Sequence, residues 1–235
     1  MSESMKALIT GGSQGIGLAV ARRLHQSGYE LFLTARDAAR LAGAAQGFDA
    51  GVTGFACDLG RPEEIEALIA ETRKRRFFPD VLILNAAIFG KSPRSVLEPP
   101  AQELEQLLRV NLLANYRLVQ GFIDSLKASA HPRIVLIGST AGTRVDDGSL
   151  YGISKWALRS YAYFLRSELK DMGIGVTLLN PGGTFTQKRV LSESIPEGRL
   201  LETEDIAGAV SAILSLSPQA VVEEINIRPM LGDTY

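Results

Sequence analysis

The chain has 235 residues, of which 46% are hydrophobic and 22% are charged, and its formal net charge is −1. This balance is typical of one globular domain and gives no electrostatic reason to expect nucleic acid or an anionic membrane as partner. The single cysteine, Cys57, excludes an internal disulfide and agrees with a reducing compartment. No apolar run approaches the roughly 20 residues of a membrane span, and the first residues do not resemble a signal peptide. We therefore expect one domain over residues 1–235 in a soluble, cytoplasmic protein.

Short apolar, β-branched runs alternate with longer amphipathic runs along the chain. The alternation predicts strands at Lys6–Thr10, Glu30–Ala35, Gly51–Ala56, Val81–Asn85, Arg133–Ser139, Gly175–Asn180 and Val221–Ile227. It predicts helices that begin near Gly15, Asp37, Arg61, Ala101, Leu150 and Glu204. Because several strands are apolar on both faces, the pattern predicts an α/β fold, a doubly wound parallel sheet of about seven strands with helices on both faces.

The first strand leads into the turn Thr10-Gly11-Gly12-Ser13-Gln14-Gly15-Ile16-Gly17. Glycines have no Cβ, so the backbone can turn tightly here and approach a pyrophosphate closely. The N–H groups that begin the next helix would then point at the phosphates. The same glycines also suit a strand-to-helix turn that binds nothing, so the turn alone leaves both interpretations open.

The second strand ends in Ala35-Arg36. An acidic side chain at this place would bind the adenosine ribose hydroxyls and repel a 2′-phosphate. Arg36 instead offers a fork of donors that suits a phosphate, which favours NADP(H) over NAD(H). The alternative is a solvated arginine at a helix start.

Two further strand ends offer contacts to a nucleotide. Asp58 follows the third strand and would accept a hydrogen bond from an adenine amino group, with Leu59 against the ring. Asp58 would alternatively cap the helix that follows. Asn85-Ala86-Ala87 ends the fourth strand with small residues, which would let the backbone pass close beneath a cofactor. Packing at the sheet edge is the alternative there.

A proton-transfer group is indicated in the second half of the chain. Tyr151 and Lys155 stand four residues apart, which places both on one face of a helix. A nearby ammonium favours the phenolate and lowers a tyrosine pKa by roughly one to three units, so Tyr151 becomes usable as an acid–base group. Ser139 closes a predicted strand, where its hydroxyl would bond a substrate carbonyl. Asn111 lies in a helical run and would hold a water that links Lys155 to solvent; a satisfied core amide is the alternative.

Two irregular loops follow strand ends, where open α/β sheets bind ligands. They cover about Ile88–Pro100 and Pro181–Arg199. Long loops at such places are typical of lids or binding loops, with flexible filler as the alternative. We expect substrate specificity to reside in three loops, Ile88–Pro100, Thr140–Leu150 and Thr184–Arg199.

Together these motifs resemble the short-chain dehydrogenase/reductase family, in its compact single-domain form, over essentially the whole length. They are Thr10-Gly11-x-x-x-Gly15-x-Gly17, Asp58-Leu59, Asn85-Ala86-Ala87, Asn111, Gly138-Ser139, Tyr151-x-x-x-Lys155 and Asn180-Pro181-Gly182. The resemblance implies one Rossmann-type domain, a catalytic group of Ser139, Tyr151 and Lys155 with Asn111 as fourth member, and a homodimer or homotetramer.

The resemblance also implies where the cofactor binds. Lys155 would bind the nicotinamide ribose, and the Pro181–Thr186 stretch would hold the nicotinamide carboxamide. The expected cofactor contacts are Gly11, Ser13, Gln14, Gly15, Ile16, Gly17, Arg36, Asp58, Leu59, Asn85, Ala86, Ala87, Tyr151, Lys155, Pro181, Gly182, Thr184 and Thr186.

Three departures from the family pattern bear on these expectations. Ala87 stands where the family usually has glycine, which would narrow the cofactor floor. Gln14 stands where many NADP-preferring members carry a basic residue, so the cofactor preference rests mainly on Arg36, with Ser13 beside it. The stretch 225–229 lacks the family's frequent Asp-Gly-Gly ending, which puts the usual tetramer packing in doubt.

The sequence therefore predicts an NADP(H)-dependent enzyme that interconverts a carbonyl and an alcohol by hydride transfer, with Tyr151 as acid and base. Two alternatives stay open: enoyl reductase or epimerase chemistry on the same site, and a nucleotide-sensing protein without turnover. With two histidines and one cysteine the chain offers no metal-ligand spacing, so no metal is expected. The basic run 73–76 is interpreted as a solvated helix end and Cys57 as a small buried hydrophobe.

Overall fold

The structure is a computed structural model that describes residues 4–90, 101–144, 149–186 and 198–233. The remaining parts of the three expected substrate loops, residues 91–100, 145–148 and 187–197, lie outside the described residues. Within the described part, no helix is long and apolar enough to cross a membrane.

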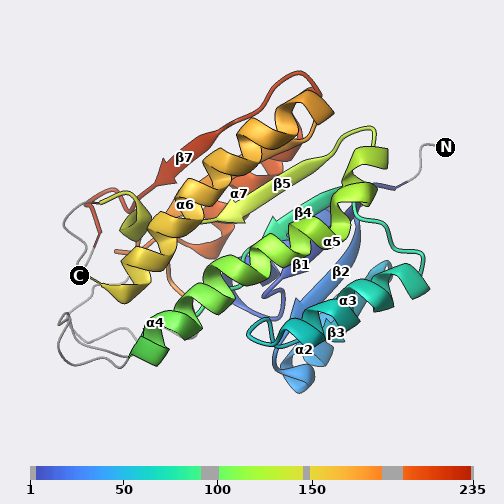
Figure 1. The fold of residues 1–235 in the computed structure, drawn as a ribbon, viewed down its shortest axis with the longest axis horizontal. Helices are drawn as coiled ribbons and strands as arrows, with labels where there is room; N and C mark the ends of the chain where they lie inside the picture. Colours follow the sequence, from blue (N-terminus) through green and yellow to red (C-terminus); the bar gives the residue numbers. More distant parts are fainter. Residues whose placement is uncertain (1–3, 91–100, 145–148, 187–197, 234–235) are drawn as a thin grey trace.

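The described residues form one parallel sheet of seven strands in the order β3-β2-β1-β4-β5-β6-β7 (Figure 1). The strands are β1 Lys6–Thr10, β2 Glu30–Ala35, β3 Val52–Ala56, β4 Val81–Leu84, β5 Arg133–Ile137, β6 Gly175–Pro181 and β7 Glu224–Ile227. The α-helices are α1 Gly15–Gln26, α2 Ala38–Ala45, α3 Pro62–Lys74, α4 Ala101–Leu108, α5 Ala114–Ala128, α6 Leu150–Leu169 and α7 Thr203–Leu214. The predicted doubly wound α/β fold is confirmed.

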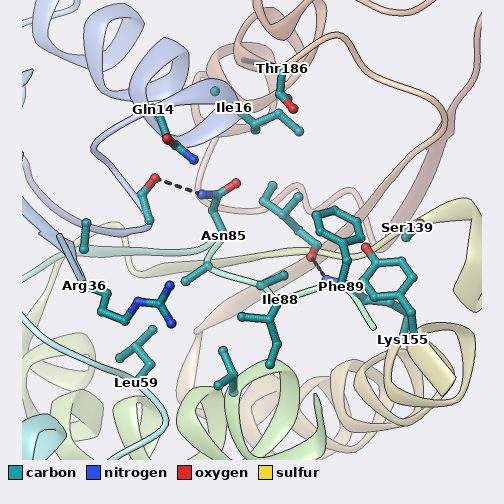
Figure 2. A pocket seen from close by; sticks show the side chains of 18 of the residues that line it. Gln14, Ile16, Arg36, Leu59, Asn85, Ile88, Phe89, Ser139, Lys155 and Thr186 are labelled. Atoms are coloured by element: carbon teal, nitrogen blue, oxygen red, sulfur yellow. Dashed lines mark hydrogen bonds between the residues drawn. The ribbon is translucent and has the colours of Figure 1, made fainter. Parts of the chain in front are cut away.

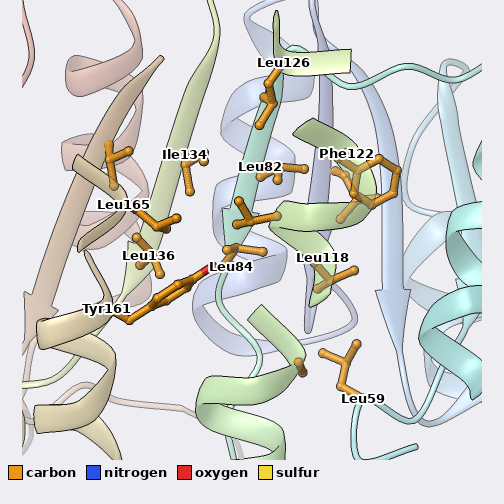
Figure 3. Close-up of a cluster of buried hydrophobic side chains, with 14 of the residues drawn as sticks. Leu59, Leu82, Leu84, Leu118, Phe122, Leu126, Ile134, Leu136, Tyr161 and Leu165 are labelled. Atoms are coloured by element: carbon orange, nitrogen blue, oxygen red, sulfur yellow. The ribbon is translucent and has the colours of Figure 1, made fainter. Parts of the chain in front are cut away.

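Alternate residues of each central strand enter one of two apolar cores, because successive side chains of a strand point to opposite faces. On one face, strand residues such as Leu82 and Ile134 pack with α3, α5 and α6, as Figure 3 shows for Phe122 and Leu165. On the other face, strand residues such as Ile83 pack with α1, α2 and α7. Burial on both faces explains why these strands are continuously apolar.

Several predicted element boundaries were wrong by one to three residues, and two of them matter for the site. β4 ends at Leu84 rather than Asn85, because the Asn85 N–H bonds the Thr10 hydroxyl at 2.9 Å instead of continuing the ladder. β5 ends at Ile137 rather than Ser139, because Ser139 begins a short 3₁₀ turn, Thr140–Gly142.

The remaining differences lie at the edges of the sheet and in the helices. β3 begins at Val52 instead of Gly51, β7 at Glu224 instead of Val221, and β6 runs to Pro181. The helix predicted to begin near Leu150 is α-helical to Leu169 and closes with one 3₁₀ turn, Lys170–Met172. Between α4 and α5 the helical run contains a π-helical segment, Arg109–Leu113, which sequence periodicity did not indicate.

Candidate active site

A large cleft runs along the carboxyl ends of the strands, across the point between β1 and β4 where the strand order reverses. Its volume is about 1470 Å³, more than the roughly 300–1,000 Å³ of a typical ligand pocket. The predicted residues that line it are Gly11, Ser13, Gln14, Gly15, Ile16, Arg36, Asp58, Leu59, Asn85, Ala86, Ala87, Ser139, Tyr151, Lys155, Pro181, Gly182, Thr184 and Thr186. Gly17 and Asn111 are the predicted residues that are not among the lining residues. The tertiary structure therefore gathers nearly all of the expected site into one cleft.

The glycine-rich turn has the shape that a phosphate site requires. Gly11 and Gly15 adopt positive φ angles of 68° and 54°, which side-chain-bearing residues rarely adopt. A Cβ on Gly17 would lie 2.6 Å from the Asn85 Nδ2 and overlap the Gly11 carbonyl, so glycine is needed for packing below the turn. A Cβ on Gly15 would meet only the Thr186 side chain, at 3.4 Å, so the turn is open on the cleft side. The backbone at the start of α1 thus faces the cleft, where a pyrophosphate would fit.

Asn85 ties the end of β4 to this turn. Its Nδ2 donates to the Thr10 carbonyl at 2.9 Å, and the Thr10 hydroxyl accepts from the N–H groups of Asn85 and Ala86 at 2.9 and 3.0 Å. The amide of Asn85 is therefore used to position the backbone that forms the cleft floor. Ala86 and Ala87 follow as lining residues.

Arg36 and Arg40, which follow the end of β2, both line the cleft. Figure 2 shows the Arg36 side chain extending into the cleft, near Leu59. Arg40 was not singled out from the sequence; its Nη1 donates to the Gln14 Oε1 at 2.9 Å and its Nη2 lies 3.4 Å from the Asp37 carboxylate. The signal that would have found Arg40 is its place in the first turn of α2, three residues after the cap Asp37.

Asp58 braces the turn after β3. Its Oδ1 accepts from the Gly60 N–H at 2.9 Å, and its own N–H donates to Glu64 Oε2 at 2.7 Å. The N-cap of α3 is Arg61, so the alternative interpretation of Asp58 as helix cap is wrong. Neighbouring Cys57 is buried, as predicted, and burial raises the pKa of its thiol to about 12.

Lys155 lies in the protein interior beside Tyr151. Its side chain is almost wholly buried, its Nζ donates to the Ile137 carbonyl at 2.9 Å, and it lies 5.6 Å from the centre of the Tyr151 ring. Burial lowers the pKa of the Lys155 ammonium to about 7. Unless an anionic group is bound nearby, Lys155 is therefore fully protonated only below neutral pH. Only the protonated form carries the positive charge that would favour a Tyr151 phenolate.

Ser139 is brought to α6 by close backbone packing. A Cβ on Gly142 would lie 2.8 Å from the backbone carbonyl atoms of Lys155, so a glycine lets the 3₁₀ turn contact the helix. The Ser139 oxygen accepts from the Ala141 N–H at 3.2 Å, and no described residue accepts from its hydroxyl hydrogen. The Ser139 N–H donates to Asn180 Oδ1 at 3.3 Å. The bond from the Ala141 N–H thus orients the Ser139 hydroxyl. The hydroxyl hydrogen can still be donated to a ligand.

Asn180 belongs to a polar network that the sequence did not reveal. Its Nδ2 donates to Glu224 Oε1 at 2.9 Å, and Glu224 also receives both Arg159 donors, at 2.9 and 3.2 Å, and the Tyr163 hydroxyl at 2.6 Å. These contacts join the edge strand β7 and helix α6 to the backbone of Ser139.

Asn111 is held in the π-helical segment by three side-chain hydrogen bonds. Its Oδ1 accepts from the Ile88 N–H at 2.9 Å, and its Nδ2 donates to the Ile88 carbonyl at 3.0 Å and to Ser154 Oγ at 2.9 Å. This matches the satisfied core amide that was the alternative interpretation. The catalytic role of Asn111 stays a prediction.

The C-terminal segment reaches back to the cleft. Asp233 lines it, accepts from the Gly183 N–H at 2.9 Å and lies 3.6 Å from Arg228. The C-terminal segment, which lacks the family's Asp-Gly-Gly ending, therefore contacts the Pro181–Thr186 stretch. Within that stretch Thr184 is buried and its hydroxyl donates to the Gly182 carbonyl.

The comparisons with known proteins agree with this geometry. A family model described as short chain dehydrogenase matches residues 5–194. "Dehydrogenase/reductase SDR family member 4" of Mus musculus is 30% identical over 227 residues, covering 89% of this chain and 80% of the relative. "Farnesol dehydrogenase" of Aedes aegypti is 31% identical, covering 95% of each chain. The solved alcohol dehydrogenase of Thermococcus sibiricus, complexed with 5-hydroxy-NADP, superposes with a TM-score of 0.86 at 29% identity, covering 99% of this chain and 100% of its own.

The cleft geometry and these similarities lead to one conclusion: the chain belongs to the short-chain dehydrogenase/reductase family of oxidoreductases.

Proposed function

We propose that the protein interconverts a carbonyl and an alcohol with NADP(H) as the redox partner and Tyr151 as acid and base. The observation that carries the proposal is the position of Tyr151, with Lys155 and Ser139, in the same cleft as the glycine-rich turn. The cleft volume of about 1470 Å³ supports the proposal, because it exceeds that of a typical ligand pocket, roughly 300–1,000 Å³.

The nicotinamide supplies the hydride, or accepts it in the reverse reaction, when the cofactor is bound. Ser139 donates a hydrogen bond to the carbonyl oxygen and so stabilises the negative charge that develops there. Tyr151 gives its proton to the same oxygen, and the Lys155 ammonium stabilises the phenolate that results. An anionic ligand bound close to Lys155 would counteract the lowering of its pKa by burial and favour the charged form.

The proposed preference for NADP(H) rests on the two arginines at the adenosine end. The Arg36 guanidinium makes no hydrogen bond or ion pair with the described residues, while Arg40 is held between Gln14 and Asp37. Together they offer donors of the right geometry for a 2′-phosphate. Solved relatives described as complexed with 5-hydroxy-NADP and with NADP support this cofactor.

The proposal is tested by NADPH consumption with a panel of aldehydes, ketones, diketones and ketoacyl thioesters, with NADH in parallel. Tyr151→Phe removes the proton donor but keeps the ring, so turnover should fall at least 100-fold while NADPH binding stays within a few-fold. Undiminished turnover in this variant refutes the mechanism. Tight NADPH binding by the wild type without hydride transfer to any carbonyl of the panel would favour the sensor interpretation.

We also propose that a second copy of the chain covers an aromatic face on α5 and α6. Tyr116, Tyr161 and Phe164 form a continuous row, with ring centres 5.8 and 6.4 Å apart. Tyr116 and Phe164 are solvent-exposed in the single chain, and so is Leu113, which lies three residues before Tyr116. Figure 1 shows α5 and α6 side by side on one face of the sheet. Contiguous exposed apolar surface of this kind is typical of a protein–protein interface.

A further inference from the structure

Phe89 stands in contact with the proposed acid–base group. Its ring centre lies 4.7 Å from that of Tyr151, with 32° between the ring planes. Figure 2 shows Phe89 in the cleft on the same side as Ser139 and Lys155. Phe89 lies in the loop Ile88–Pro100, in which substrate specificity was expected, although no motif singled out this residue.

The position of Phe89 is set by the backbone before it. The N–H and the carbonyl of Ile88 are both bonded to the Asn111 side chain, at 2.9 and 3.0 Å. Asn111 is itself buried and bonded to Ser154 on α6, the helix that carries Tyr151. The rings of Phe89 and Tyr151 are therefore presented by two segments that share one hydrogen-bonded brace.

Phe89 is nevertheless 69% exposed. A large apolar side chain that lines a ligand cleft and remains so exposed is a surface that a bound molecule would cover. One side of the ring is taken by Tyr151, and much of the rest is open to the cleft. A ligand group that covers the Phe89 ring would therefore lie beside the Tyr151 ring.

We propose that Phe89 sets the substrate class: the site takes aryl ketones and aryl aldehydes, whose aromatic ring is bonded directly to the carbonyl carbon. This inference rests on the proposed function. Because the carbonyl oxygen must meet Tyr151, the group that reaches Phe89 is the one attached next to the carbonyl. An aromatic ring there gains offset or edge-on contacts that a saturated ring of similar size does not gain.

The reaction that follows is balanced by the proposed chemistry. The carbonyl carbon receives a hydride from NADPH, the carbonyl oxygen receives a proton from Tyr151, and solvent returns a proton to Tyr151. The products are a benzylic alcohol and NADP⁺. Phe89 takes no part in these transfers and acts only by contact with the substrate ring.

The test compares two methyl ketones, acetophenone and 1-cyclohexylethanone, which differ in whether the ring is aromatic. The ratio of their kcat/KM values is measured for the wild type, Phe89→Leu and Phe89→Tyr. Intrinsic differences in reactivity cancel when each variant ratio is divided by the wild-type ratio. We expect Phe89→Leu to lower the preference for acetophenone about two- to tenfold, and Phe89→Tyr, which keeps the ring, to retain it.

Phe78→Leu is the matched control, because Phe78 is 52% exposed and does not line the cleft. Its ratio should equal that of the wild type. An equal loss for both ketones in Phe89→Leu would make Phe89 a general apolar wall and overturn the aryl proposal, while the carbonyl-reductase proposal would stand. An unchanged ratio in Phe89→Leu overturns it equally.

Binding of the two ketones to the protein saturated with NADP⁺ is measured in parallel by ligand-observed NMR. This measurement tests the role of Phe89 even if neither ketone is reduced. Absence of reduction would contradict the proposed function, but it would not contradict a contact between Phe89 and the substrate ring. A wild-type preference for acetophenone that is lost in Phe89→Leu supports the role of Phe89. No preference in the wild type overturns it.

Discussion

At the scale of single residues, Lys155 carries the largest electrostatic penalty described at the site. An unfolded lysine titrates near ~10.4, whereas burial lowers the pKa of Lys155 to about 7 in the folded protein. Between these two values the unfolded chain binds one proton more than the folded chain. For this group, stability therefore rises as pH increases through the window, and the penalty is constant below it.

The prediction is that Lys155→Met, which removes the charge but keeps an unbranched side chain, is more stable than the wild type near neutral pH. Its advantage should shrink as pH rises, by at most about 1.4 kcal/mol per pH unit. Urea denaturation of both proteins over this window, without cofactor, measures the difference. A difference that does not depend on pH would mean that Lys155 is not desolvated as described.

Arg36 is the residue proposed to set the cofactor preference, by contact with the 2′-phosphate of NADP(H). Because hydrogen bonds to charged groups contribute about 1.5–3 kcal/mol, Arg36→Ala should raise KM for NADPH roughly 10- to 100-fold. KM for NADH should change little, since NADH lacks the 2′-phosphate.

Arg23→Ala is the control for Arg36→Ala, because Arg23 is exposed on α1 and does not line the cleft. Steady-state kinetics with both cofactors give the comparison. A similar loss with NADH and NADPH in Arg36→Ala would indicate that the side chain supports the fold of the cleft and does not bind the phosphate.

At the scale of elements, the site depends on how β7 and α6 hold the end of β5. Glu224 is the common acceptor for Arg159, Tyr163 and Asn180. Burial by itself would raise the pKa of Glu224, but the hydrogen bonds from Tyr163 and Arg159 outweigh it and leave the pKa lowered. The carboxylate is therefore the form that this network stabilises.

Glu224→Gln keeps the shape of the side chain but turns one acceptor into a donor. We expect it to lower the free energy of unfolding by about 1–3 kcal/mol and to lower kcat, because Asn180 also holds the Ser139 backbone. Its neighbour Glu223 is 63% exposed and lies 3.7 Å from Arg166, so Glu223→Gln should change stability by less than about 0.5 kcal/mol. Urea denaturation and kinetics of both variants test this; equal effects would refute the network.

At the scale of the whole molecule, the aromatic face of α5 and α6 predicts self-association. Phe164 is 52% exposed at one end of the aromatic row, so Phe164→Glu would place a charge in the proposed interface. We expect a dimer or larger assembly for the wild type and a shift of at least tenfold in its dissociation constant for the variant.

Light scattering after size-exclusion chromatography measures the assembly over a range of concentrations. Phe78→Glu is the control, because Phe78 is equally exposed but lies outside this face. A wild type that stays monomeric at every concentration would exclude this interface.

The features that the sequence determined by itself are local in the chain. The alternation of apolar runs predicted the strands and helices because burial on one or two faces leaves a period that can be read residue by residue. Gly11, Gly15 and Gly17 predicted a turn open to phosphate because conformational freedom is a property of the residue itself. Tyr151 and Lys155 were placed on one helical face by their spacing alone.

The features that only the tertiary structure decided depend on contacts between distant segments. Phe89 meets Tyr151, Asp233 meets Gly183, and Glu224 meets Arg159 only because the fold brings together segments that are far apart in the chain. The depressed pKa of Lys155 has the same origin, since burial is a property of the packed fold. No pattern of spacing along the chain records these partners, because each contact is set by sheet order and by side-chain packing across elements.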